Sequence, residues 1–150
     1  MYGDKGQVPH EEYLIPIGEA EVKKEGNDVT VVSFGKILKE VFKASEKLSQ
    51  DNIDIEIIDL RTVRPLDIET IINSVKKTNR LVILEEAWPF GNVSTEIAYQ
   101  VQNQALDYLD APIIKINTAD TPTPYSPVLL KEWLPNHNDV IKAVNKVLYK

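Results

Sequence analysis

The chain has 150 residues, 43% hydrophobic and 27% charged, which is enough for one core that buries roughly two thirds of the unfolded surface. Its 17 Lys+Arg and 23 Asp+Glu give a net charge of −6, which disfavours nucleic acid and anionic membranes as partners. No apolar run approaches the roughly 20 residues of a membrane span. The absence of cysteine excludes thiolate nucleophiles, Cys-ligated metal clusters and disulfides.

The first part of the chain has the composition of a connector. Residues 1–28 carry seven acids and three lysines, a net charge of −4, interspersed with glycine and proline, and such a segment buries little surface. We expect residues 1–18 to be an interdomain linker and residues 19–150 a folded domain. Within that domain, Glu19–Lys23 is expected to form a short strand, joined to the next strand by a tight turn and paired antiparallel at the sheet edge.

Short strands alternate with amphipathic helices along the remainder. Apolar and β-branched runs predict strands over 29–34, 53–59, 81–85 and 113–116. Apolar residues spaced at three and four positions predict helices over 37–48, 68–75, 93–106 and 140–148, the second capped by Asp67. This alternation forces parallel pairing through right-handed crossovers. We therefore predict an α/β fold of three layers, αβα, around a mixed, mostly parallel five-stranded sheet.

The loops at the carboxyl ends of the parallel strands are the expected place for ligand or partner sites. They hold neither a glycine-rich phosphate loop nor the Gly-x-Ser-x-Gly of a hydrolase, and the two histidines, His10 and His137, are isolated. Gly35, after the first parallel strand, is expected to be an ordinary turn rather than an anion site. We therefore predict no catalytic, cofactor-binding or metal-binding residue in this chain.

Charged residues follow two of the strands. Arg61, in a loop that also holds Arg64 and Pro65, and the pair Glu85 and Glu86 could meet across neighbouring loops, as a buried ion pair or as an interface. Adjacent residues of a strand point to opposite faces, so the two glutamates are poorly placed to share one substrate. We favour a structural or interface role for this network over catalysis.

Aromatic side chains mark the remaining two loops. Trp88 and Phe90 flank a proline, and they are expected to pack either against another domain or on the core of this one. The loop after the last strand carries three prolines within six residues, which predicts an extended strip with Tyr125 exposed or docked on a partner. The residues alone thus predict a docking domain without an active site of its own.

Four ordered motifs resemble a known family. They are Leu14-Ile15-Pro16-Ile17-Gly18, the run from Asp59 to Asp67, the run from Val75 to Val82 followed by Glu85-Glu86, and Leu109-Asp110-Ala111-Pro112. Over essentially its whole length the chain resembles the C-terminal domain of the transketolase family. The resemblance is greatest to the beta subunits of pyruvate dehydrogenase decarboxylating components, within the 2-oxo acid dehydrogenases.

The resemblance implies that the chain is the C-terminal piece of a longer subunit, inactive by itself, whose holoenzyme decarboxylates pyruvate and transfers the acetyl group to lipoyl. Thiamin diphosphate and magnesium would be held elsewhere in that holoenzyme and not by this chain. The implied partners are the alpha subunit and a second beta subunit of a tetramer, and the peripheral subunit-binding domain of the dihydrolipoyl acetyltransferase. Asp110 and the terminal carboxylate of Lys150 are the implied binding residues for that domain, because carboxylates accept hydrogen bonds from arginine; without the resemblance, Asp110 would be taken for a capping or solvated acid.

Two alternatives stay open. One is the branched-chain 2-oxo acid dehydrogenase beta subunit, or another C-terminal domain of the transketolase family. The other is a stand-alone anion-binding regulatory module that uses the loops of Arg61 and Glu86. The N-terminus lacks a secretory or transit signal, and the expected location is the cytoplasm of a bacterium, or the mitochondrial matrix in a eukaryote.

Overall fold

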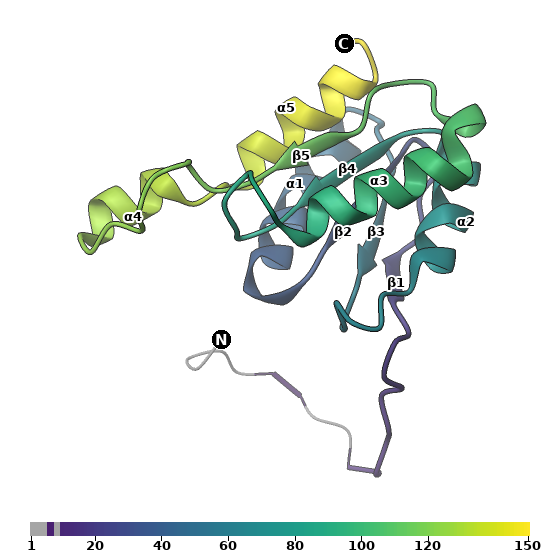
Figure 1. The fold of residues 1–150 in the computed structure, drawn as a ribbon, viewed down its shortest axis with the longest axis horizontal. Helices are drawn as coiled ribbons and strands as arrows, with labels where there is room; N and C mark the ends of the chain where they lie inside the picture. The colour runs from purple at the N-terminus through teal and green to yellow at the C-terminus, as the bar shows by residue number, and fades with distance from the viewer. Residues whose placement is uncertain (1–5, 8–9) are drawn as a thin grey trace.

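The computed structural model describes residues 6–7 and 10–150, so part of the predicted linker lies outside the described residues. Figure 1 shows one sheet with helices packed on it and a short helix, α4, standing off the body. In chain order the elements are β1 (Glu21–Lys24), β2 (Val29–Ser33), η1 (Gly35–Ile37), α1 (Leu38–Gln50), β3 (Ile55–Asp59), α2 (Ile68–Thr78), β4 (Leu81–Leu84), α3 (Val93–Ala105), η2 (Leu106–Tyr108), β5 (Ile114–Ile116), α4 (Pro127–Trp133) and α5 (His137–Val147).

The five strands form one mixed sheet in the order β1-β3-β2-β4-β5. Strands β3, β2, β4 and β5 are parallel, and β1 alone runs antiparallel at one edge. This confirms the predicted three-layer αβα fold with a five-stranded, mostly parallel sheet. The central strands β2, β3 and β4 are buried on both faces, as their continuous apolar sequences require.

The edge strand β1 is antiparallel as expected, but its neighbour is β3 and not β2, the strand that follows it in sequence. Both sides of β2 are already occupied by β3 and β4. The turn between β1 and β2 crosses the start of β3, where the N–H groups of Asn27 and Asp28 both donate to the Asp54 carbonyl, at 3.1 and 2.9 Å. A tight turn therefore does not make its two strands partners here.

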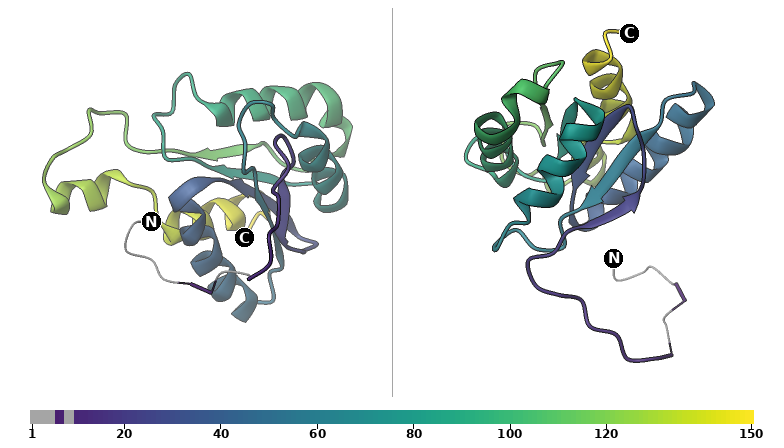
Figure 2. Two further views of the ribbon diagram at one scale, coloured as in Figure 1. Left: turned by 90° about the horizontal axis from the view of Figure 1, so that it is seen from below. Right: turned by 90° about the vertical axis from the view of Figure 1, so that its right-hand side faces the viewer.

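Helices α1 and α5 cover one face of the sheet, and α2 and α3 cover the other (Figure 2). Each face has its own core cluster: Val31, Ile57 and Val144 belong to the first, and Ile58, Ile71 and Ile97 to the second. Odd and even positions of a strand point to opposite faces, which is why Ile57 and Ile58 belong to different clusters. No helix in the described part of the chain is long and apolar enough to cross a membrane.

Helix α4 was not predicted, because the prolines before it indicated an extended strip. Residues 118–126 before it form neither helix nor strand and bend at 120–121 and 125–126, and Pro127 occupies the first turn of the helix, where its missing N–H costs nothing. The pair Ser126-Pro127 is the sequence signal for this start. Tyr125, just before the helix, is fully exposed.

Candidate functional site

A groove with a volume of about 1090 Å³ lies at the carboxyl ends of the strands, on the side of α3. It runs between the loop after β3 and the loop after β4. Its lining includes five residues that the sequence analysis names: Arg64, Pro65, Glu85, Trp88 and Phe90. The structure therefore brings together Pro65, Glu85 and the two aromatic side chains, although they come from two separate loops.

Glu85 is buried beneath this groove and holds the start of α3. It is 5% exposed, and its two carboxylate oxygens accept from the backbone N–H groups of Val93 (3.3 Å) and Ser94 (2.8 Å). The next N–H, that of Thr95, donates to the side chain of Asn92 at 2.9 Å. Because a helix N-terminus attracts negative charge, Glu85 acts as a structural anchor. Glu86, the next residue, lies in the bend after β4 and is exposed.

Arg61 does not reach the glutamates, so the proposed pairing across neighbouring loops is wrong. Strand β2 separates the ends of β3 and β4, and Arg61 instead forms an ion pair with Glu21 of β1. Lys23 also pairs with Glu21. The hydrogen bond from Lys23, and to a lesser degree that from Arg61, lowers the pKa of Glu21 despite the opposing effect of burial.

The end of the predicted linker is attached beside the groove. The Gly18 N–H donates to the Thr62 hydroxyl at 3.0 Å, and the Ala20 N–H donates to the Asp67 carboxylate at 2.9 Å. Asp67 also caps α2 by accepting from the Thr70 N–H at 3.1 Å, which confirms the predicted cap. The loop before α2 therefore fixes both a helix start and the point where the linker joins the domain.

The aromatic residues of the groove are exposed. Trp88 is 51% exposed, and Phe90 is 90% exposed, so Phe90 does not pack on the core of this domain. The Trp88 indole N–H donates to the Thr121 carbonyl at 2.9 Å, and that of Trp133, from α4, donates to the same carbonyl at 3.0 Å. The two tryptophans thereby fix Thr121, in the segment that leads to Tyr125 and α4.

Asp110 lies at the opposite end of the sheet, where β5 begins. Its N–H donates to the Asn79 carbonyl at 2.9 Å, and its carbonyl accepts from the Tyr149 hydroxyl at 3.1 Å. Its carboxylate is 57% exposed and lies 3.4 Å from the guanidinium of Arg80, whose Nε donates to the Val147 carbonyl at 3.1 Å. Asp110 is thus connected both to the last turn of α5 and to the residue before Lys150.

Lys150 lies three residues after the end of α5. Its N–H donates to the Asn145 carbonyl at 3.0 Å, so the backbone at the end of the sequence is folded back on α5. The two residues implied by the resemblance therefore belong to one connected part of the surface. The residues that connect them, Arg80 and Tyr149, were not singled out from the sequence, because nothing in their local pattern shows which distant segment they meet.

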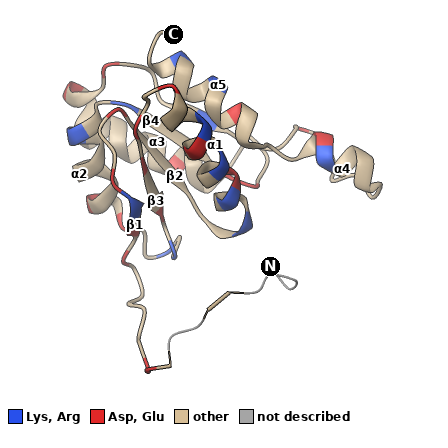
Figure 3. Cartoon of the chain, turned by 180° about the vertical axis from the view of Figure 1, so that it is seen from behind, with Lys and Arg blue, Asp and Glu red and all other residues tan. Residues whose placement is uncertain are grey.

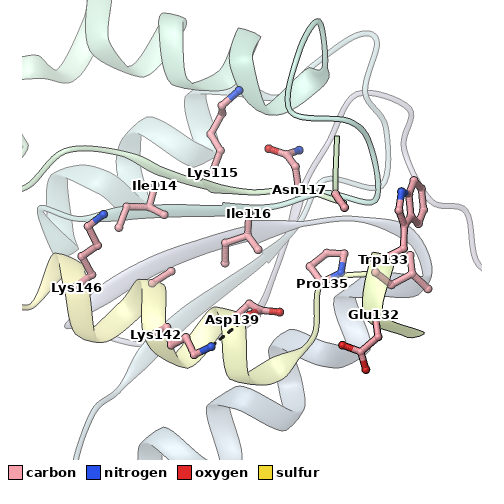
Figure 4. A pocket seen from close by; sticks show the side chains of 13 residues that line it. Ile114, Lys115, Ile116, Asn117, Glu132, Trp133, Pro135, Asp139, Lys142 and Lys146 are labelled. Atoms are coloured by element: carbon pink, nitrogen blue, oxygen red, sulfur yellow. Dashed lines mark ion pairs between the residues drawn. The ribbon is translucent and has the colours of Figure 1, made fainter. Parts of the chain in front are cut away.

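Beside Asp110 there is a hollow of about 440 Å³. Another hollow of about 440 Å³ lies between β5 and α5 (Figure 4), where Lys142 pairs with Asp139 at 3.9 Å. Figure 4 shows Lys115 pointing away from α5, in agreement with its hydrogen bond to the Thr95 hydroxyl of α3.

Around β1, β3 and α1, basic and acidic segments are intermixed (Figure 3).

The donor set does not fit magnesium diphosphate. Within residues 6–7 and 10–150 no three His, Asp or Glu side chains come together as metal ligands. The first N–H groups of α3, at the carboxyl ends of the strands, already donate to Glu85 and Asn92 and are not available to a phosphate.

Comparisons with known proteins agree with this architecture. The chain is 49% identical over 151 residues to the pyruvate dehydrogenase E1 component subunit beta of Rhizobium meliloti, a match that covers 100% of this chain and 33% of that protein. It is 42% identical over 147 residues to the acetoin:2,6-dichlorophenolindophenol oxidoreductase subunit beta of Bacillus subtilis, covering 98% of this chain and 43% of that one. The chain thus spans less than half the length of these relatives.

A solved structure described as a split gene transketolase, inactive beta4 tetramer, has the same fold. It matches with a TM-score of 0.80 and 25% identity, over 96% of this chain and 46% of that one. The family described as Transketolase, C-terminal domain matches residues 18–140, which is most of the chain. With this match, and with relatives of this similarity, the chain belongs to the transketolase C-terminal domain family.

Proposed function

We propose that this chain is the C-terminal assembly and docking domain of a pyruvate dehydrogenase beta subunit. The complete enzyme would carry out the thiamin diphosphate-dependent oxidative decarboxylation of pyruvate and the transfer of acetyl to lipoyl. The cofactor and its magnesium would be held by the alpha subunit and by the rest of the beta subunit, so this chain alone is expected to be inactive. The names of the relatives, and the fraction of their length that it spans, support this assignment.

The observation that carries the docking role is the exposed carboxylate of Asp110. This carboxylate lies beside Arg80, whose Nε donates to the Val147 carbonyl, and the Tyr149 hydroxyl donates to the backbone carbonyl of Asp110. Asp110 is therefore connected to the residues just before Lys150, and we propose that the terminal carboxylate of Lys150 belongs to the same surface. Arginine forms charge-assisted hydrogen bonds with such groups. We therefore propose that this pair binds arginines of the peripheral subunit-binding domain of the dihydrolipoyl acetyltransferase.

The assembly role is supported by the groove at the other end of the sheet. Phe90 and the linker residues Leu14 and Ile17 are 90%, 86% and 81% exposed. Gly18 approaches Pro65, which lines the groove, so closely that an added Cβ would lie 2.8 Å from the Pro65 Cγ. Exposed apolar surface of this kind marks protein interfaces. We propose that the alpha subunit and the second beta subunit of the tetramer cover this face.

The docking role is tested in the tetramer formed by the alpha subunit and the full-length beta subunit that contains this domain. Calorimetric titration with the peripheral subunit-binding domain should show that Asp110→Asn weakens binding about tenfold, because a charge-assisted hydrogen bond is lost. Amidation of the terminal carboxylate should add to the loss. Asp107→Asn is the matched control: it removes the same charge from an exposed residue of η2, and we expect less than about a twofold change. Unchanged affinity for both Asp110→Asn and the amidated chain would refute the site.

We propose pyruvate as the substrate of the complete enzyme because the pyruvate dehydrogenase subunits reach 50% identity, compared with 42% for the acetoin-named relative. Turnover of pyruvate, branched-chain 2-oxo acids and acetoin by the complete tetramer tests this choice.

A regulatory anion site at Arg61 has less support, because that guanidinium already pairs with Glu21. A rise in melting temperature with increasing concentrations of anionic metabolites would favour it.

A further inference from the structure

The hollow beside Asp110 is largely apolar although it lies at the surface. Its lining, apart from Asp110 itself, consists of Gln102, Leu106, Leu109, Ala111, Pro112 and Ile113. Leu106 is 58% exposed. It follows the buried stripe of α3 that ends at Ala105, and the next residue along a helix turns away from such a stripe. An exposed leucine is therefore presented next to an exposed carboxylate.

The carboxylate on the rim is held from the other side. Arg80 approaches Oδ2 of Asp110 at 3.4 Å, while its own Nε is bonded to the Val147 carbonyl. The backbone of Asp110 is bonded in both directions, to Asn79 and to Tyr149. The position of Asp110 relative to the hollow is thus fixed before any partner arrives.

Affinity that comes from charge alone depends on the salt concentration at this place. Salt screens an ion pair at a half-exposed carboxylate, so the contribution of that pair falls as ionic strength rises. Arg80 also places a positive charge beside the same group. Burial of apolar surface does not depend on charge screening. A partner that filled the hollow would therefore add affinity that the carboxylate cannot provide.

We propose that the docking receptor has two parts: Asp110 binds an arginine of the partner, and the hollow lined by Leu106 takes an aliphatic side chain next to that arginine. This inference rests on the proposed docking function and specifies the partner surface, an arginine beside an aliphatic residue. The hollow supplies affinity at any ionic strength, and the carboxylate supplies register and salt-dependent attraction.

The test uses the same tetramer and the isolated peripheral subunit-binding domain as the probe, titrated at low and at high salt. Leu106→Ala should weaken binding about fivefold at both salt concentrations, because it removes apolar contact area. Asp110→Asn should weaken binding mainly at low salt. Leu106→Met, which conserves volume and polarity, should stay within about twofold of the unmodified protein. Leu106 is more than half exposed, so its substitution leaves the core intact.

The outcomes separate the two proposals. If Leu106→Ala leaves affinity unchanged while Asp110→Asn weakens it, the hollow plays no part and the two-part receptor is refuted. A Leu106→Ala effect that disappears at high salt, or that Leu106→Met reproduces, refutes it as well. If Asp110→Asn leaves affinity unchanged at low salt, the Asp110 docking site itself fails.

Discussion

Glu85 is the residue whose replacement has the most clearly predicted effect on the stability of the domain. Its carboxylate accepts the first two N–H groups of α3, from Val93 and Ser94, inside the domain. In Glu85→Ala, the N–H of Ser94 loses its acceptor in a place without solvent, because Ser94 is 0% exposed. An orphaned buried donor costs about 1–3 kcal/mol. The lost charge at the helix N-terminus adds about 0.5 kcal/mol, and the half-buried Val93 N–H adds less than Ser94 does.

We therefore expect Glu85→Ala to lower the free energy of unfolding by about 3 kcal/mol, measured by urea denaturation of this chain with an unchanged m value. Glu85→Gln keeps one acceptor oxygen and should lose about half as much. The neighbouring Glu86 is an internal control, because it is exposed and Glu86→Ala should stay within about 0.5 kcal/mol. If Glu85→Ala were as stable as Glu86→Ala, the anchoring role of Glu85 would be wrong.

Two further predictions concern the attachment of β1 and the turn after it. Asp67→Ala should cost about 1–2 kcal/mol in the same urea assay, because the cap of α2 and the acceptor for Ala20 are both lost. Burial raises the pKa of Asp67, but the hydrogen bonds from Ala20 and Thr70 outweigh it and leave the pKa below its ordinary value. The stabilisation by Asp67 is therefore complete above about pH 4 and is lost as the pH falls through the folded-state pKa. The free energies of unfolding of the unmodified chain and of Asp67→Ala should accordingly converge in acid. A difference that stayed constant with pH would contradict this. Gly26→Ala should cost more than about 3 kcal/mol, because its Cβ would lie 2.3 Å from the Ile55 carbonyl carbon. Gly6→Ala is the control and should be neutral, because no atom lies within 4 Å of the added carbon. Equal stability of the two variants in thermal unfolding would refute the close approach at Gly26.

The strands of the sheet and the helices that cover it were largely predictable because each of them has a local signature. Val29–Ser33 is β-branched and apolar on both faces, and α2 has both its apolar spacing and its Asp67 cap in the sequence. These signals act within a few residues of each other. Strand order has no such signal: the position of β2 between β3 and β4 depends on which crossover covers which face. For this reason the sequence alone could not show that Arg61 pairs with Glu21 and not with Glu85.

The site could be predicted only in part, for the same reason. Trp88 and Phe90 are unusual side chains in a loop, and their exposure follows from the surface position of that loop. The link from Arg80 to Asp110 and Val147 joins segments 30 and 67 residues apart in sequence, and no local pattern connects them. Asp110 itself was named only through the resemblance to the family.

The attachment of residues 18–21 beside the groove has a consequence for association. Gly18, Ala20 and Glu21 are each bonded to the loop between β3 and α2, and an added Cβ at Gly18 would touch Pro65, which lines the groove. Any polypeptide fused ahead of Gly18 therefore starts at the rim of the surface that it could cover. Tethering of this kind replaces a bimolecular encounter by an intramolecular one, with an effective concentration on the order of millimolar for a short flexible connection. Contacts at the groove that would be too weak between separate molecules can then be occupied most of the time.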